Sequence, residues 1–144
     1  MHNYSEFISL MGNKILSKNE KQKRLYFEVG NENIIEVADY LFTKLGCRLS
    51  TATATETYRG IEVLYHFSLD KSGEYYCPRI VMTDKKNPRM NSITPVVRGA
   101  EWIEREMSEM LGVTFEGHPR PEPLLTGNHP QNIKVPLRKW RSNG

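Results

Sequence analysis

Apolar side chains occupy every second position from Ile61 to Leu69 in the stretch YRGIEVLYHFSLD, residues 58–70. This period of two predicts a strand with one buried face, because successive side chains of a strand point to opposite sides. The preceding segment 47–57, CRLSTATATET, is rich in threonine, which favours strands. The two segments together predict a β-hairpin within a sheet.

A third strand is expected at residues 75–83, YYCPRIVMT, after a turn at DKSG. Its Pro78 donates no backbone hydrogen bond and so favours an edge strand or a bulge. His66 falls on the face of its strand opposite the apolar row, and we interpret it as a solvent-facing or helix-covered side chain.

A helix is predicted between Asn33 and Gly46. Asn33 can accept the first free backbone N–H groups, Glu36 follows three residues later, and Gly46 permits a left-handed end. The expected buried stripe consists of Ile35, Ala38, Phe42 and Leu45.

A strand at residues 24–29 precedes that helix, and residues 4–16 have only a loose helical pattern followed by a polar run. The chain is therefore predicted to be α+β, with a mixed or antiparallel sheet (a β-α-β-β-β core) and a helix on one face. A C-terminal helix and an extended proline-rich tail follow. We expect one domain, with residues 1–91 as its body and 92–144 as a helix and an extended strap.

The composition argues against several kinds of site. The two cysteines form no CxxC motif and the four histidines show no metal spacing, so we expect neither an iron–sulfur nor a zinc site in this chain. No stretch approaches the apolar length of a membrane span, and without a signal peptide a reducing cytosol is the simpler expectation. The net charge of +3 comes mostly from the two ends, unlike the basic stripe with aromatics of a nucleic-acid binder.

The helix predicted at residues 99–111 mixes charged and large apolar side chains. At 100° per residue, one half of its circumference holds Trp102, Ile103, Met107, Met110 and Leu111, and the other half holds Glu101, Glu104, Arg105, Ser108 and Glu109. Glu106 falls within the apolar half, where a carboxylate must be paired or hydrogen-bonded.

Glu106 has two interpretations. It is a general base acting with His118, or it is a structural ion-pair partner of Arg98 or of a basic residue in another chain. The structural role is favoured, because the sequence offers no nucleophile, metal or phosphate cradle nearby.

The stretch SITPVVRGAEWIEREMSEMLGVTFEGHPRPEPLLT, residues 92–126, resembles the signature of the hydrophilic 30 kDa subunit family of respiratory complex I and its hydrogenase relatives. The matching elements are a Ser-x-Thr-Pro lead-in, an Ala-x-Trp helix with Glu-Arg-Glu, and Phe-x-Gly-His-Pro before a leucine pair. Residues 136–139, PLRK, resemble the family's closing motif. Glu122 departs from the usual lysine or arginine, and the chain ends soon after Lys139. This compact form is more similar to the subunit of membrane-bound hydrogenases or of an F420 dehydrogenase.

The resemblance implies a scaffold without a cofactor of its own. Family members pack on a large catalytic subunit, which has a quinone or nickel–iron site, and on a small iron–sulfur subunit. The resemblance implies that all three subunits lie at the cytoplasmic side of a membrane module that moves protons or sodium. The expected interface residues are Trp102, Glu104, Arg105, Glu106, Glu109, Phe115, Gly117, His118, Pro119, Leu124, Leu125, Arg138 and Lys139.

Three alternatives remain open at this point. The first is the 30 kDa subunit of a complete NADH:quinone oxidoreductase. The second is a small hydrolase or transferase that uses Glu106 and His118. The third is a basic nucleic-acid adaptor.

Overall fold

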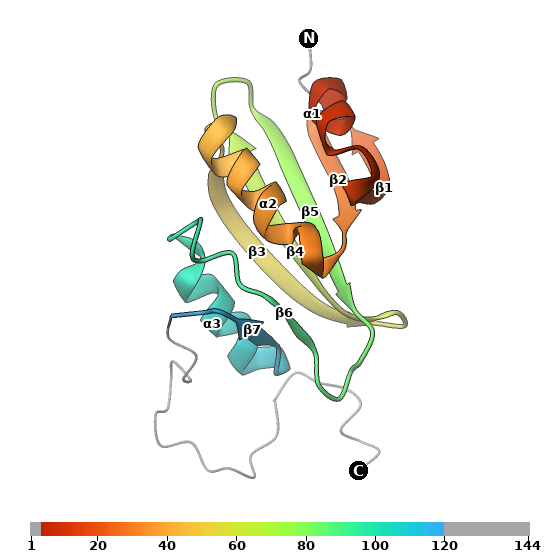
Figure 1. The fold of residues 1–144 in the computed structure, drawn as a ribbon, viewed down its shortest axis with the longest axis vertical. Helices are drawn as coiled ribbons and strands as arrows, with labels where there is room; N and C mark the ends of the chain where they lie inside the picture. Colours follow the sequence, from red (N-terminus) through yellow and green to blue (C-terminus); the bar gives the residue numbers. More distant parts are fainter. Residues whose placement is uncertain (1–3, 120–144) are drawn as a thin grey trace.

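A five-stranded sheet forms the centre of the chain in a computed structural model that describes residues 4–119 (Figure 1). Its strand order is β1-β2-β5-β4-β3, and every neighbouring pair is antiparallel except the parallel pair β2–β5. The strands are β1 (Ile15–Lys21), β2 (Arg24–Val29), β3 (Arg48–Thr57), β4 (Gly60–Leu69) and β5 (Glu74–Met82).

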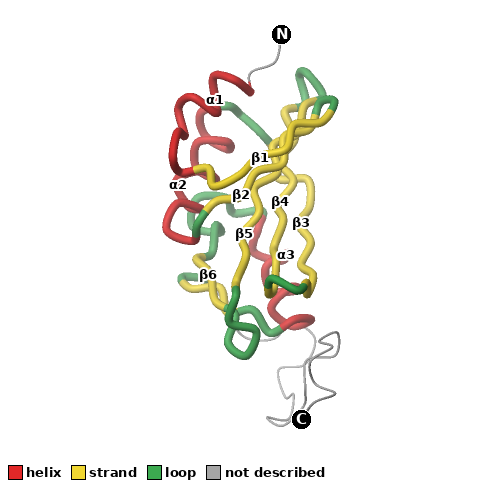
Figure 2. The backbone as a smooth tube through the Cα atoms, turned by 90° about the vertical axis from the view of Figure 1, so that its right-hand side faces the viewer, coloured by secondary structure: helices red, strands yellow, loops and turns green. Residues whose placement is uncertain are grey.

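Helices cover the apolar face of this sheet. They are α1 (Tyr4–Met11), α2 (Ile34–Asp39) with a π turn (Tyr40–Lys44), and α3 (Ala100–Leu111); single 3-10 turns occupy Gly12–Lys14 and Asn31–Asn33. Figure 2 shows α1 and α2 on the same side of the strands. The aromatic rings of Phe7 and Phe27 lie 5.1 Å apart, and those of Tyr4 and Tyr76 lie 5.0 Å apart. These contacts attach α1 to the central strands.

A second, two-stranded sheet holds α3 in place. Its parallel strands are β6 (Arg89–Asn91) and β7 (Thr114–Glu116), which come before and after the helix in the chain. The Ser92 N–H donates to the Glu116 carbonyl over 2.8 Å, and the Thr114 N–H donates to the Pro88 carbonyl over 2.8 Å. Backbone hydrogen bonds thus join the chain before α3 to the chain after it.

The predicted α+β class and the β-α-β-β-β order are confirmed, the latter as β2-α2-β3-β4-β5. The loose helical pattern ends earlier than expected, at Met11, and the chain then enters β1, which was not predicted. Six of the seven residues of β1 are exposed, so no alternation of apolar residues marks it. The proline-rich tail from residue 120 onward lies outside the described residues.

The buried stripe of the second helix differs from the prediction. Ile35 and Phe42 are exposed, and the buried side chains are Ile34, Val37, Ala38 and Leu41. Asn33 makes no side-chain cap hydrogen bond, because a 3-10 turn leads into the helix instead. Gly46 does end the helical segment in the left-handed region, with φ of +77°.

Pro78 was wrongly expected at an edge or a bulge. It lies in β5, the middle strand of the sheet, opposite Phe27 of β2. The β4–β5 ladder pairs Leu64 with Arg79 and Phe67 with Tyr76 in unchanged register, and it omits the pairs between them. The sheet tolerates the missing donor through this local gap, because pairing continues on both sides.

Candidate functional site

Among the described residues, the most deeply buried charged side chain lies on α3. Glu104 is 0% exposed and accepts four hydrogen bonds. Its Oε2 accepts from the Tyr65 hydroxyl over 2.7 Å and from the Ile93 N–H over 3.0 Å. Its Oε1 accepts from the hydroxyls of Ser92 over 2.5 Å and Thr94 over 2.9 Å. One carboxylate thus joins α3, the loop before it and strand β4.

Local sequence explains this arrangement. Glu104 shares a helix face with Ala100, Met107 and Leu111, which lie one or two turns away and are all buried. The Ser-x-Thr spacing lets both hydroxyls reach the same carboxylate oxygen, and the Ser92 hydroxyl also accepts the Thr94 N–H over 3.0 Å. Gly112, with φ of +77°, ends the helix.

The carboxylate is satisfied entirely by neutral donors. No salt bridge to Glu104 is present among residues 4–119. A carboxylate offers about four lone-pair positions, and four donors use them all. Burial, and then the neighbouring carboxylate, raise the pKa of Tyr65 well above its usual range, so Tyr65 keeps its proton and donates it. Glu104 is therefore a structural junction and offers no free lone pair to a substrate.

The orientation predicted for this helix was right only in part: Met107 and Leu111 are buried as expected. Glu106, expected on the buried side, is exposed, and Glu104, expected on the polar side, is fully buried. Trp102 and Met110, which fall in the predicted apolar half, are 58% and 47% exposed. The buried side is instead formed around Glu104, because its four donors offset the cost of burying the charge.

The structure does not bring Glu106 and His118 together. No hydrogen bond or ion pair connects these two side chains within the described part of the chain. His118 Nε2 lies 3.0 Å from the carbonyl oxygen of Glu101, at the start of α3. This geometry removes the support for an acid–base pair.

The other expected interface residues are distributed around α3. Phe115 is buried on β7, Gly117 has φ of +84°, and Pro119 is exposed. Arg105 and Glu109 are half-buried on the helix. The remaining four, Leu124, Leu125, Arg138 and Lys139, lie outside the described residues.

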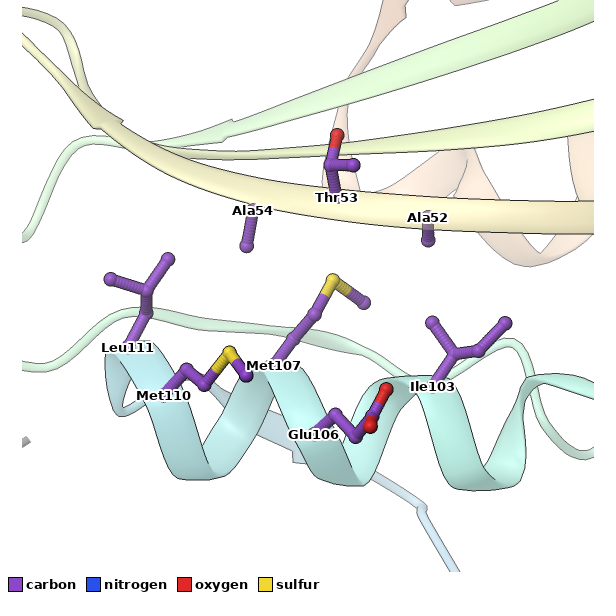
Figure 3. A pocket seen from close by; sticks show the side chains of 8 residues that line it. All are labelled: Ala52, Thr53, Ala54, Ile103, Glu106, Met107, Met110 and Leu111. Atoms are coloured by element: carbon purple, nitrogen blue, oxygen red, sulfur yellow. The ribbon is translucent and has the colours of Figure 1, made fainter. Parts of the chain in front are cut away.

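A hollow of about 280 Å³ lies between α3 and strand β3, which pack against each other beside it. In Figure 3 the side chains of Ala52 and Ala54 point from the strand toward the helix, and Thr53 points away. The helix contributes Ile103, Glu106, Met107, Met110 and Leu111. The small alanine side chains leave the space between the two elements open.

The described residues contain no group of three or more histidine, cysteine or acidic side chains placed to hold a metal ion. Between residues 4 and 119 no helix has the length and apolar character needed to cross a bilayer. Cys47 and Cys77 are both buried free thiols.

Residues 27–141 match the family described as respiratory-chain NADH dehydrogenase, 30 kDa subunit. The chain belongs to this family. An NADH-quinone oxidoreductase subunit from Ruegeria pomeroyi is 31% identical over 118 residues, covering 78% of this chain and 58% of that protein. The subunit of the same name from Roseobacter denitrificans is 31% identical over 137 residues, covering 85% of this chain and 67% of that protein. The chain thus spans a little more than half of the first relative's length.

A solved structure, the membrane-bound sulfane sulfur reductase described as an archaeal respiratory membrane complex, contains a chain with the same fold. Its TM-score to this chain is 0.76 at 22% identity, and the match covers 96% of this chain and 85% of the other. The fold of this chain therefore also matches that of a chain in a solved respiratory membrane complex.

Sequence reasoning missed Tyr65 as a partner of Glu104. It lies 39 residues away in the sequence and looked like one more member of an apolar row. Ser92 and Thr94 were recognised within the family signature but were not assigned to a contact. Their spacing before the helix is the one signal that could have identified Glu104 as the buried carboxylate.

Proposed function

We propose that this 30 kDa-family chain is a non-catalytic scaffold subunit of a membrane-bound, ion-translocating oxidoreductase, of the energy-converting hydrogenase or complex I type. One observation carries the proposal. Helix α3 directs a fully hydrogen-bonded carboxylate inward and exposes Trp102 and Met110 outward. The inward side fixes the helix, and the outward side remains available for contact.

Exposed tryptophan and methionine side chains suit a protein interface. Both residue types are enriched in interface cores, and tryptophan is enriched among the residues that dominate binding energy. An exposed face of this kind on a rigidly held helix gains stability by covering its apolar surface with another protein. This favours a subunit role over that of an independent enzyme.

The proposed partners are a large catalytic subunit and a small iron–sulfur subunit. In this proposal the iron–sulfur clusters, and any nickel–iron site, belong to those partners and not to this chain. The assembly lies at the cytoplasmic side of the membrane, and this chain associates with the membrane only through it. Holding the redox subunits at a fixed distance is the contribution we assign to the chain.

A complete NADH:quinone oxidoreductase is the second candidate assembly. It is favoured by the names of the relatives from Ruegeria and Roseobacter, which are both described as subunits of NADH-quinone oxidoreductase. Both candidates give the chain the same structural role and differ in the electron donor and acceptor.

Affinity purification of the tagged full chain from detergent-solubilised membranes tests the proposal. Mass spectrometry should identify a large hydrogenase-like or quinone-site subunit and a small iron–sulfur subunit in the same particle. Iron analysis should find the metal in the particle and none in the chain purified alone. A chain that purifies without companions and turns over a substrate would contradict the proposal.

A further inference from the structure

We propose that strand β3 receives an additional strand from a partner protein. The partner segment is extended, apolar on the side that faces α3, and carries a lysine or arginine opposite Glu106. This inference rests on the proposed scaffold function and specifies the chemistry of one partner at the α3 surface.

The first observation is the free edge of the sheet. β3 is the last strand, and within residues 4–119 it pairs only with β4. A strand at an edge leaves a row of N–H and C=O groups without partners, and an added strand is the structure that satisfies all of them in order. The open backbone therefore selects an extended occupant over a helical one.

The two edges of the sheet differ in their protection. Proteins commonly protect an edge with charged side chains. β1, at the other edge, carries Lys18, Glu20 and Lys21 on an exposed strand. β3 carries no charged residue from Leu49 to Thr55. Its pairing with β4 has one irregularity, between Leu49 and Thr51. The uncharged residues after this irregularity, 51–55 (TATAT), are the unprotected part of this edge.

The second observation is the hollow beside this edge. Its lining includes Ala52 and Ala54 of β3, and Met107, Met110 and Leu111 of α3 (Figure 3). Side chains of an added strand alternate between the two faces, so every second one would point toward the helix side. Apolar side chains at those positions would fill the hollow and cover Met110, which is 47% exposed.

Charge specifies the partner further. Glu106 is exposed at the rim of the hollow, and no ion pair to it exists in the described chain. At the far end of β3, Glu56 already pairs with Lys85 over 3.7 Å. The available carboxylate beside an apolar hollow therefore favours a single basic side chain within the partner strand.

Hydrogen–deuterium exchange on the free full chain and on the purified native assembly tests the inference. The amides of residues 51–57 that point away from β4 should exchange at least about tenfold more slowly in the assembly, because the added strand accepts their hydrogen bonds. Amides of the central strand β5 provide the internal reference, since they are already paired on both sides. Unchanged exchange at 51–57 in an intact assembly would overturn the strand addition and leave the scaffold proposal standing. A chain that enters no assembly would instead overturn the scaffold proposal.

Two other occupants give different results. Protection of the outward-pointing amides of residues 51–57 in the free chain at low concentration would show that the chain covers its own edge. Protection of these amides that grows with concentration would show a second copy. Either result overturns the assignment to a partner.

A charge variant separates the basic contact from the backbone pairing. Glu106→Gln should weaken retention of the chain in the assembly by about two- to fivefold, as expected for loss of a partly exposed ion pair. Glu6→Gln makes the same change on an exposed position of α1 and should have no effect. Equal retention of both variants would contradict a basic residue opposite Glu106.

Discussion

Removal of the Glu104 carboxylate should destabilise the chain more than removal of any other carboxylate on α3. Glu104→Ala leaves the hydroxyls of Tyr65, Ser92 and Thr94 and the N–H of Ile93 without their acceptor in a buried site. Glu106→Ala removes the same group two residues away, where it is exposed. The pair isolates the effect of burial.

The magnitude follows from the four orphaned donors. Each unsatisfied buried polar group costs about 1–3 kcal/mol, so Glu104→Ala should lower the free energy of unfolding by at least about 4 kcal/mol. For a chain of this size, 1 kcal/mol corresponds to about 3–4 °C in Tm, which gives a decrease of at least about 12 °C. Glu104→Gln keeps one acceptor oxygen, and rotatable hydroxyls can accept from its amide, so we expect about 2 kcal/mol. Glu106→Ala should remain within about 0.5 kcal/mol of the parent.

Urea and thermal unfolding of the purified chain, followed by circular dichroism, measure these differences. A double mutant of Glu104 and Thr94 should show less than additive destabilisation, because the two side chains share a hydrogen bond. Similar melting temperatures for Glu104→Ala and Glu106→Ala would refute the assignment of Glu104 as the structural junction.

Three further predictions concern other parts of the fold. Burial, and then the charge of Arg24, lower the pKa of His66 below 6.5, so folding favours the neutral imidazole. The free energy of unfolding in urea should therefore be fully present above about pH 6.5 and fall as the pH drops through the lower folded pKa. His66→Gln should reduce this pH dependence. Burial raises the pKa of Cys47 to about 12 and that of Cys77 to about 11. A thiol reagent at about pH 8 should therefore label both cysteines only after unfolding. Rapid labelling of the native chain would contradict their burial. Met107→Ala should cost about 2 kcal/mol, whereas Met110→Ala should cost less than about 0.5 kcal/mol, and equal costs in urea unfolding would contradict the orientation of α3.

Strand β4 could be predicted because its two faces differ in burial, and the sequence alternates accordingly from Ile61 to Leu69. Strand β1 could not, since it lies at an edge with both faces exposed and contains no apolar alternation. Strands β6 and β7 are three residues each and pair across more than twenty residues of chain. Local sequence carries too little information to specify such a contact.

The orientation of α3 at the site could not be predicted from local sequence either. The apolar half predicted for α3 includes Trp102 and Met110, but both are exposed, whereas Glu104 of the predicted polar half is buried. A helix that also contacts a partner has two apolar sides, so periodicity alone does not determine its orientation. The deciding partners, Tyr65 and the Ser-x-Thr loop, are brought to the helix only by tertiary structure.

The central claim is that the chain supports a redox assembly through its exposed α3 face and takes no part in the chemistry. Trp102→Ala, measured in native membranes, tests it most directly, because this side chain is 58% exposed and its loss leaves the core intact. The account predicts fewer assembled complexes on a native gel and an unchanged turnover for each complex that does assemble. A normal amount of complex with reduced turnover would contradict it.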